Sequence, residues 1–165
     1  MKKYLDGSIS PNPAEVNAYA AASFYAADRY ISYKTDWGKD YRDGTMILCD
    51  RYTTSNAVHQ MQKLTRVQWD GFLDWLFDYE YEKLEIPAPD KVIYLDVLPE
   101  ISAGLIEIRG RTKDIHENID FLTSSRNAAL YAADRHGWSV IKCYGDTGML
   151  PIKEIHERIL ITIGL

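Results

Sequence analysis

The chain has 165 residues, of which 46% are hydrophobic and 26% are charged, and its net charge is −5. This composition is typical of a soluble globular protein, and the length predicts a single domain over residues 1–165. An acidic chain without a basic run argues against sequence-independent nucleic-acid binding, and the absence of about 20 consecutive apolar residues argues against a membrane span. No apolar stretch follows Lys2 and Lys3, and Cys49 and Cys143 lie in apolar runs as expected for reduced core thiols. The sequence therefore predicts a cytoplasmic protein.

The first half of the chain is mostly helical in pattern. Asn12 is suited to cap a helix and Pro13 to open it, which predicts a helix from Ala14 to about Tyr33. A shorter helical stretch follows over 37–42 and ends at the turn signal Asp43-Gly44. The next run, 45–49, is short and apolar, and it predicts a buried strand. Helical sequence resumes near residue 55 and again over 66–83.

The second half alternates strands with helices. Strands are predicted over 91–97 and 138–144, and helices over 99–108, 115–136 and 151–160. Strands that alternate with helices favour a parallel sheet covered by helices, so the expected fold is α/β with three αβα layers. In such sheets, ligands bind at the carboxyl ends of the strands.

The first predicted strand ends in Asp50-Arg51-Tyr-Thr-Thr-Ser55-Asn56, with His59-Gln60 shortly after. Arginine presents a rigid fork that matches phosphate oxygens, and an aspartate beside it can hold a metal ion or orient the arginine. The hydroxyl and amide groups that follow can bond a polar ligand. The alternative is an aspartate–arginine pair that only ties the strand end to the next helix.

Two further segments carry candidate binding residues. Tyr25 and Arg29 lie four residues apart on one helix face, where a ring can stack on a base and a guanidinium can bond its edge. The alternative is a half-buried tyrosine beside a solvated arginine. Arg109-Gly-Arg111-Thr-Lys interrupts the helical pattern and predicts a cationic lid near 107–116 that closes over phosphates. Its alternative is a solvated connector.

Taken in order, these segments resemble thymidylate kinase, a P-loop nucleoside-monophosphate kinase. The resemblance covers nearly the whole chain, and its most specific parts are the segment from Asn17 to Arg29 and the Asp50-Arg51-Tyr52 signature with its flank. The run Pro87-Ala-Pro-Asp-Lys-Val-Ile-Tyr-Leu95 and the basic segment before Asp114 also fit. The resemblance implies a P-loop NTPase-like fold, a homodimer, and phosphoryl transfer from ATP to dTMP with Mg²⁺, giving dTDP.

The resemblance also implies roles for individual residues. Tyr25 matches the aromatic residue that stacks on thymine, usually a phenylalanine, and Arg29 matches the arginine that bonds the base. Asp50 and Arg51 match the catalytic pair that handles the monophosphate and the magnesium environment. Arg109 and Arg111 match catalytic arginines of the lid. The positions that line the nucleotide pocket are Ser55, Asn56, His59 and Gln60.

One expected motif is not in the sequence. Kinases of this fold begin with a strand, then Gly-x-x-x-x-Gly-Lys-Ser/Thr, whose backbone N–H groups and lysine hold the ATP phosphates. The only Gly-Lys pair here is Gly38-Lys39, and no strand pattern precedes it. We therefore expect the chain to lack the N-terminal strand or strands of the family, about 50 residues for a unit of that kind. We also expect the strands at 45–49 and 91–97 to pair directly or to leave exposed edges.

Three functions remain open on the sequence. The first is the bulk of a thymidylate kinase that keeps the dTMP site and the lid but not the ATP-binding loop. The second is a non-catalytic nucleotide-binding remnant, and the third is a related deoxynucleoside kinase, since those enzymes also carry an aspartate–arginine pair after a strand.

Overall fold

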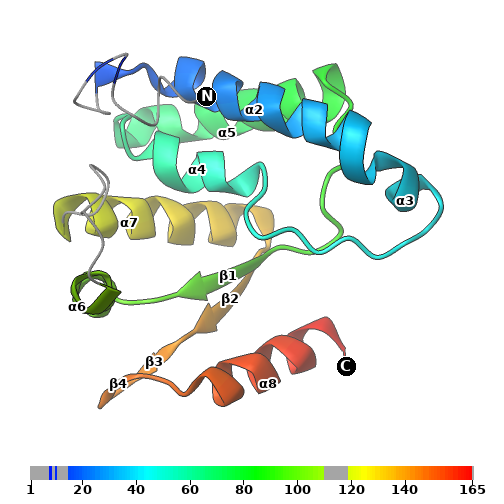
Figure 1. Ribbon diagram of the computed structural model, residues 1–165. Helices are drawn as coiled ribbons and strands as arrows, with labels where there is room; N and C mark the ends of the chain where they lie inside the picture. The colour runs from blue at the N-terminus through cyan, green and yellow to red at the C-terminus, as the bar shows by residue number, and fades with distance from the viewer. Residues whose placement is uncertain (1–7, 9, 11–14, 110–118, 165) are drawn as a thin grey trace. The chain divides into compact units, whose positions relative to one another are not determined.

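The computed structural model describes residues 8, 10, 15–109 and 119–164. These residues form two compact units, 1–88 and 89–165, and each unit has its own core. The first unit is helical, whereas the second contains the parallel sheet (Figure 1). The predicted α/β class with a parallel sheet is confirmed.

The first unit consists of helices joined by short turns. In chain order they are α2 (Ala18–Ser32), the π-helical turn η2 (Tyr33–Trp37), α3 (Gly38–Arg42), α4 (Thr54–Met61), the 3-10 turn η3 (Arg66–Gln68), α5 (Trp69–Phe77) and the π-helical turn η4 (Asp78–Lys83). Helix α4 packs against both α2 and α5 (Figure 1). Ala21, Ala22 and Ala26 of α2 have no exposure to solvent, and the same holds for Met61, Phe72 and Leu76 of α4 and α5.

The start of α2 differs from the sequence prediction. Asn12 and Pro13 lie outside the described residues, and the helix that the structure describes begins at Ala18. The Oδ1 atom of Asn17 accepts hydrogen bonds from the backbone N–H groups of Tyr19 at 2.9 Å and Ala20 at 3.2 Å. Asparagine is among the best N-cap residues because its side chain satisfies these otherwise unpaired donors. A second capping residue five positions further along therefore sets the boundary.

Gly38 of the Gly-Lys pair has a packing role. It opens α3, and a Cβ atom added to it would lie 2.2 Å from the carbonyl oxygen of Tyr33 and 2.9 Å from its ring. Only glycine fits a position this close to a neighbouring backbone. The pair therefore lies in a tight helical connection and not in a phosphate-binding loop.

The predicted strand at 45–49 is wrong. This segment has no regular secondary structure, and Met46 and Leu48 are 84% and 95% exposed. Cys49, expected in a core, is exposed as well, whereas Cys143 is buried as expected. A strand forms only where a neighbour supplies hydrogen bonds for its backbone, and no such neighbour is present among the residues that the structure describes. The apolar run is therefore left in solvent, with neither direct strand pairing nor a buried edge.

The second unit holds a two-stranded parallel sheet. Its elements are β1 (Ile93–Asp96), α6 (Pro99–Arg109), α7 (Ile119–His136), β2 (Ser139–Lys142), β3 (Tyr144–Gly145), β4 (Gly148–Met149) and α8 (Ile152–Ile163). β1 pairs with β2 in the register Ile93 to Ser139 through Asp96 to Lys142. Parallel strands need a long crossover, which here includes α6 and α7. The short hairpin of β3 and β4 was not predicted.

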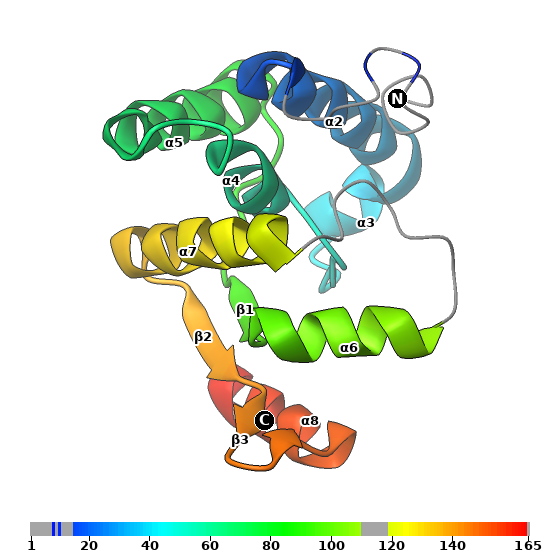
Figure 2. The same cartoon turned by 90° about the vertical axis from the view of Figure 1, so that its left-hand side faces the viewer.

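Helices cover both faces of this sheet. Both views place α7 on one side of the two strands and α8 on the other (Figure 2). On the α8 side, Ile155 packs with Ile141 and Cys143, and the half-buried Ile93 and Val97 complete the cluster. On the other side, α7 contacts both strands and buries Ala128, Ala129, Ala132 and Ala133. Within the second unit the helices thus enclose the sheet, as expected for an αβα arrangement.

Candidate functional site

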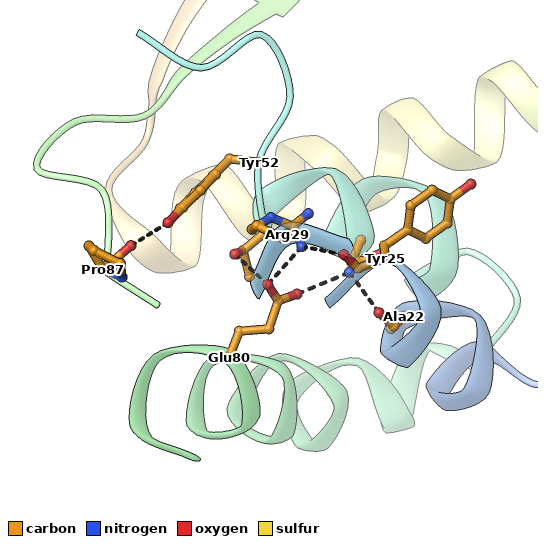
Figure 3. Close-up of polar contacts among 8 residues, drawn as sticks. Ala22, Tyr25, Arg29, Tyr52, Glu80 and Pro87 are labelled. Atoms are coloured by element: carbon orange, nitrogen blue, oxygen red, sulfur yellow. Dashed lines mark hydrogen bonds and ion pairs between the residues drawn. The ribbon is translucent and has the colours of Figure 1, made fainter. Parts of the chain in front are cut away.

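Arg29 is the centre of a polar cluster inside the first unit. It lies in the last turn of α2, and its Nη1 atom donates to Glu80 Oε2 at 2.8 Å and to the carbonyl oxygen of Tyr25 at 3.3 Å (Figure 3). The guanidinium carbon lies 5.3 Å from the centre of the Tyr52 ring, within the range of a cation–π contact. The Tyr52 hydroxyl in turn donates to the Pro87 carbonyl at 2.7 Å. The ring is therefore held by Arg29 at its face and by Pro87 at its hydroxyl.

Glu80 is fully buried and collects three donors. Besides Arg29, its carboxylate accepts from Thr53 Oγ1 at 2.8 Å and from Asn56 Nδ2 at 3.1 Å. An ionised carboxylate is acceptor-only, so it suits three donors at once. Burial raises the pKa of the Glu80 carboxyl, and the nearby Arg29 charge together with the hydrogen bonds from Thr53 and Asn56 opposes that rise. The cluster joins the end of α2, the start of α4 and the turn η4.

Two hydrogen-bonding groups beside this carboxylate remain unpaired in the part of the chain that the structure describes. Both hydrogens of Arg29 Nη1 are used, whereas its Nε and Nη2 atoms have no hydrogen-bond partner in the part of the chain that the structure describes. Asn56 Nδ2 donates to Glu80 and to the Ala22 carbonyl at 3.3 Å, which fixes the orientation of the amide. Its Oδ1 atom accepts no hydrogen bond from the described residues. A donor edge and an acceptor oxygen are therefore held next to one carboxylate.

The predicted phosphate-binding residues lie at the surface of the first unit. Asp50 and Arg51 are exposed, and Arg51 has a positive φ of 69°. Non-glycine residues in this left-handed region cost free energy and concentrate at functional sites. Arg51 Nη1 lies 3.2 Å from His59 Nε2. The structure thus brings together two predicted site residues that are eight positions apart in the chain. Asp50 takes no part in that contact.

The other predicted residues take different positions. Ser55 is half-buried in the first turn of α4, and Gln60 on the same helix is 3% exposed, with an Oε1 atom that has no partner among the described residues. The Tyr25 ring packs beside Val16 and Ala21, and it points away from Glu80 (Figure 3). The Tyr25 carbonyl oxygen accepts a hydrogen bond from Arg29.

The lid and metal predictions can be followed only in part. Arg109 ends α6, but its side chain and the whole of Arg111 lie outside the described residues. Among the residues that the structure describes, no three or more histidine, cysteine, aspartate or glutamate side chains gather where a metal ion could be held. None of the described helices is both long and apolar enough to cross a membrane.

A second polar cluster lies in the second unit, and it was not predicted. Arg126 of α7 donates from Nε to Asp96 Oδ1 at 2.6 Å and from Nη2 to Asp96 Oδ2 at 2.8 Å. The Tyr144 hydroxyl lies 3.2 Å from the same Nη2 and 3.4 Å from Asp96 Oδ2. Hydrogen bonding to Asp96 raises the pKa of Arg126. The cluster links the end of β1 to α7 and β3.

Sequence reasoning also missed Glu80, although a signal for it was present. Leu73, Leu76 and Glu80 are spaced by three and four residues, so the glutamate lies on the buried stripe of a helix where an apolar side chain is expected. A charged residue on such a stripe is almost always paired. The identity of its partners could not be found from the spacing, since Arg29 and Asn56 are 51 and 24 residues away.

Comparison with known proteins connects these features to one family. The thymidylate kinase family model matches residues 1–159. A homologue described as a probable thymidylate kinase, from Staphylothermus marinus, is 31% identical over 125 residues, which cover 76% of this chain and 58% of that protein. The thymidylate kinase of Mycobacterium tuberculosis is 29% identical over 128 residues, which cover 74% of this chain and 59% of that protein.

A thymidylate kinase homologue of Treponema pallidum is 28% identical over 149 residues, which cover 88% of this chain and 67% of that protein. The chain thus spans about three fifths to two thirds of the length of these relatives. The family model covers most of the chain, and it includes the Arg29 helix and the segment from Asp50 to Gln60. The chain belongs to the thymidylate kinase family.

Proposed function

We propose that this chain binds dTMP with the Arg29 cluster, as the acceptor nucleotide of phosphoryl transfer from ATP that gives dTDP. The observation that carries the proposal is the geometry of Arg29: one nitrogen is fixed by Glu80, while the Nε–Nη2 edge is left for a ligand. A guanidinium held in this way is already ordered before a ligand binds, so donating to an oxygen acceptor costs little further conformational entropy. Family membership supports the assignment of that acceptor to a thymine nucleotide.

The phosphate group of dTMP lies, in this proposal, beside Arg51. Its guanidinium is exposed and has His59 as a neighbour at 3.2 Å, and Ser55 lies in the first turn of the helix that follows. Asp50 contributes to the Mg²⁺ environment. A single carboxylate fits that ion, because Mg²⁺ is usually held by one or two carboxylates together with substrate phosphates. When bound, the ion would neutralise charge on the phosphates, and the family resemblance assigns Arg109 and Arg111 to the same phosphates.

The remaining residues complete the nucleoside pocket. Tyr25 supplies a ring for stacking, and His59 lies near the sugar. Gln60 offers the buried Oε1 atom as an acceptor for a ligand donor or a bridging water, since a buried polar atom without a partner is costly. These roles rest on the family resemblance. The Oε1 atom of Gln60 on α4, which lacks a partner in the described part of the chain, supports the role of Gln60, whereas the Tyr25 ring points away from Glu80.

The donor nucleotide is a separate matter. The 165 residues contain no Gly-x-x-x-x-Gly-Lys-Ser/Thr sequence, so we infer that they bind ATP poorly and transfer no phosphoryl group by themselves. The complete reaction, the use of Mg²⁺ with ATP, and a homodimer are proposals for the whole protein. A non-catalytic nucleotide-binding role is favoured by the same missing motif.

Titration calorimetry tests these proposals. The full chain is titrated with dTMP, ATP and thymidine, and a parallel incubation with ATP, Mg²⁺ and dTMP is assayed for dTDP. Binding of dTMP without binding of ATP is the expected result. Formation of dTDP would show that other residues hold ATP, and tighter binding of thymidine than of dTMP would favour a deoxynucleoside kinase.

A variant tests the residue that carries the proposal. Arg29→Ala removes the donor edge and is expected to weaken dTMP binding at least tenfold, because a base oxygen then faces no donor. Circular dichroism checks that the helices remain. An unchanged dTMP affinity in a folded Arg29→Ala variant would contradict the assignment of Arg29 to the base.

A further inference from the structure

One carboxylate bonds both Arg29, which the proposed function assigns to the base, and Asn56 of the same cluster. Glu80 Oε2 accepts from Arg29, and Glu80 Oε1 accepts from Asn56. Because the two side chains bond the same carboxylate, they lie side by side, with the Nε–Nη2 edge of Arg29 as donor and Oδ1 of Asn56 as acceptor. Figure 3 shows Glu80 reaching from its helix toward Arg29. Glu80 itself is fully buried and does not reach a ligand.

This pair of groups has a polarity that distinguishes the two pyrimidines. Thymine presents an acceptor at O4 beside a donor at N3–H, whereas cytosine presents a donor at the 4-amino group beside an acceptor at N3. A donor from Arg29 next to an acceptor from Asn56 matches thymine and opposes cytosine. The selection depends on the Asn56 amide, because turning that amide over would replace the acceptor by a donor.

We infer that Glu80 is a positioning residue that sets the base selectivity of this site: by accepting from Arg29, Thr53 and Asn56 it keeps the Asn56 Oδ1 atom and the free edge of Arg29 directed at the base. The inference rests on the proposed binding of dTMP. It requires Glu80 to be acceptor-only, which is what three donors at 2.8 to 3.1 Å demand of it.

Replacing Glu80 by glutamine changes this polarity with little change in size. The glutamine oxygen takes the place of Oε2, where Arg29 and Thr53 both donate, so its amino group takes the place of Oε1 and faces Asn56 Nδ2. Two donors then face each other. The Asn56 amide relieves the conflict by turning over, which gives up its longer bond to Ala22 O at 3.3 Å and directs Nδ2 at the base.

Calorimetric titration of the full chain with dTMP and with dCMP tests the inference. For the wild type we expect binding of dTMP and at least tenfold weaker binding of dCMP. For Glu80→Gln we expect the ratio of the two dissociation constants to fall at least tenfold, and for Glu80→Asp, which restores an acceptor-only group, we expect the ratio to recover at least in part.

Thr53→Val is the matched control. It removes another hydrogen bond from the same carboxylate, at a residue as buried as Glu80, but it leaves Oε1 facing Asn56. We expect it to weaken both nucleotides by a similar factor and to keep their ratio. If Glu80→Gln lowers both affinities equally, as Thr53→Val does, Glu80 is only structural and the inference is overturned.

Two further outcomes are distinguished from a failure of the Glu80 inference: a wild-type chain that does not bind nucleotides, and a Glu80→Gln variant that does not fold. A wild-type chain that binds neither nucleotide contradicts the proposed function itself and not merely the role of Glu80. If circular dichroism shows that Glu80→Gln does not fold, Asn56→Leu, in which Glu80 is intact, replaces it. A dTMP preference that survives in a folded Asn56→Leu variant overturns the assignment of the acceptor.

Discussion

Each compact unit holds an arginine that is paired with a buried carboxylate, Arg29 with Glu80 and Arg126 with Asp96, and the two pairs use the guanidinium in different ways. In the second unit, Arg126 grips Asp96 with Nε and Nη2, the bidentate edge that fits a carboxylate or a phosphate. In the first unit, Arg29 holds Glu80 with Nη1 only, and the bidentate edge is left over. A pair of the first kind ties elements together, whereas a pair of the second kind also leaves a donor edge without a hydrogen-bond partner among the described residues.

The two carboxylates differ as well. Glu80 has no exposure and accepts from three donors, one on α2 and two at the start of α4, whereas the Asp96 side chain is 6% exposed and its arginine 23% exposed. Charged groups that are removed from water depend on their partners for all of their compensation. We therefore expect the stability of the first unit to depend more on Glu80 than the stability of the second unit depends on Asp96.

The largest expected effect is the loss of the Glu80 carboxylate. Glu80→Ala leaves a mostly buried cation, a buried hydroxyl and a buried amide unpaired, and we expect it to lower the free energy of unfolding by about 3–5 kcal/mol. Asp96→Ala leaves a more exposed cation, and we expect a cost of roughly 1–3 kcal/mol. Urea denaturation followed by circular dichroism measures both. Equal costs would remove the distinction between the two pairs.

The second test exchanges each arginine for lysine, which keeps the charge but removes the fork. In Arg29→Lys a single ammonium group can still bond Glu80, so we expect a stability cost below about 1 kcal/mol but at least a tenfold loss of dTMP affinity. In Arg126→Lys one of two parallel bonds to Asp96 is lost, and we expect a cost of about 1–2 kcal/mol with little change in dTMP binding. Denaturation and calorimetry on the same samples give both values.

The two lysine variants are thus expected to have opposite effects: Arg29→Lys lowers mainly the dTMP affinity, and Arg126→Lys lowers mainly the stability. Each variant serves as the control for the other, since the substitution is chemically identical. A larger loss of dTMP affinity in Arg126→Lys than in Arg29→Lys would place the ligand-binding guanidinium in the wrong unit.

The smallest expected effect concerns a lysine whose pKa is lowered by burial. Lys63 donates to the Val16 carbonyl at 3.3 Å, and burial lowers the pKa of its ammonium group to about 8 from the usual 10.5. Between those two values the unfolded chain binds the proton that the folded chain has released, so folded stability rises with pH. We therefore expect the wild type to gain stability relative to Lys63→Met between about pH 8 and pH 10.

The measurement is denaturation at a series of pH values, with Lys153→Met as the control. The Lys153 side chain is 88% exposed, so its removal is expected to leave the pH dependence as in the wild type. Parallel curves for the wild type and Lys63→Met would show that burial of Lys63 does not shift its titration. The comparison would then hold only for cations paired with carboxylates.

Regular elements followed the sequence where local pattern and packing agreed. The apolar spacing over 66–83 predicted a helical stretch, and the structure has α5 with a turn on either side. β1 and α8 also lie where the sequence placed them. The run 45–49 failed, because its apolar character favours a strand but a strand also needs a neighbour to bond its backbone. That neighbour is a property of the assembled sheet and not of the five residues.

The candidate site divides in the same way. Residue type and order were enough to single out Arg29, Asn56 and the Arg51–His59 segment, and the structure brings Arg29 and Asn56 to one carboxylate. Glu80 was not found, because its partners come from α2 and from the start of α4, more than 20 residues away in the chain. Tyr25 was placed on the correct helix, but its ring packs beside Val16 and points away from Glu80.

The sequence by itself determined the family and the α/β class, and it singled out the candidate site residues, because motif order and helical spacing are written along the chain. Only the tertiary structure decided which edge of Arg29 is free and which way the Asn56 amide faces. It also decided that Arg126 donates from both Nε and Nη2 to Asp96. Those choices depend on hydrogen bonds between residues distant in sequence, where a buried donor must find an acceptor in whatever element packs beside it.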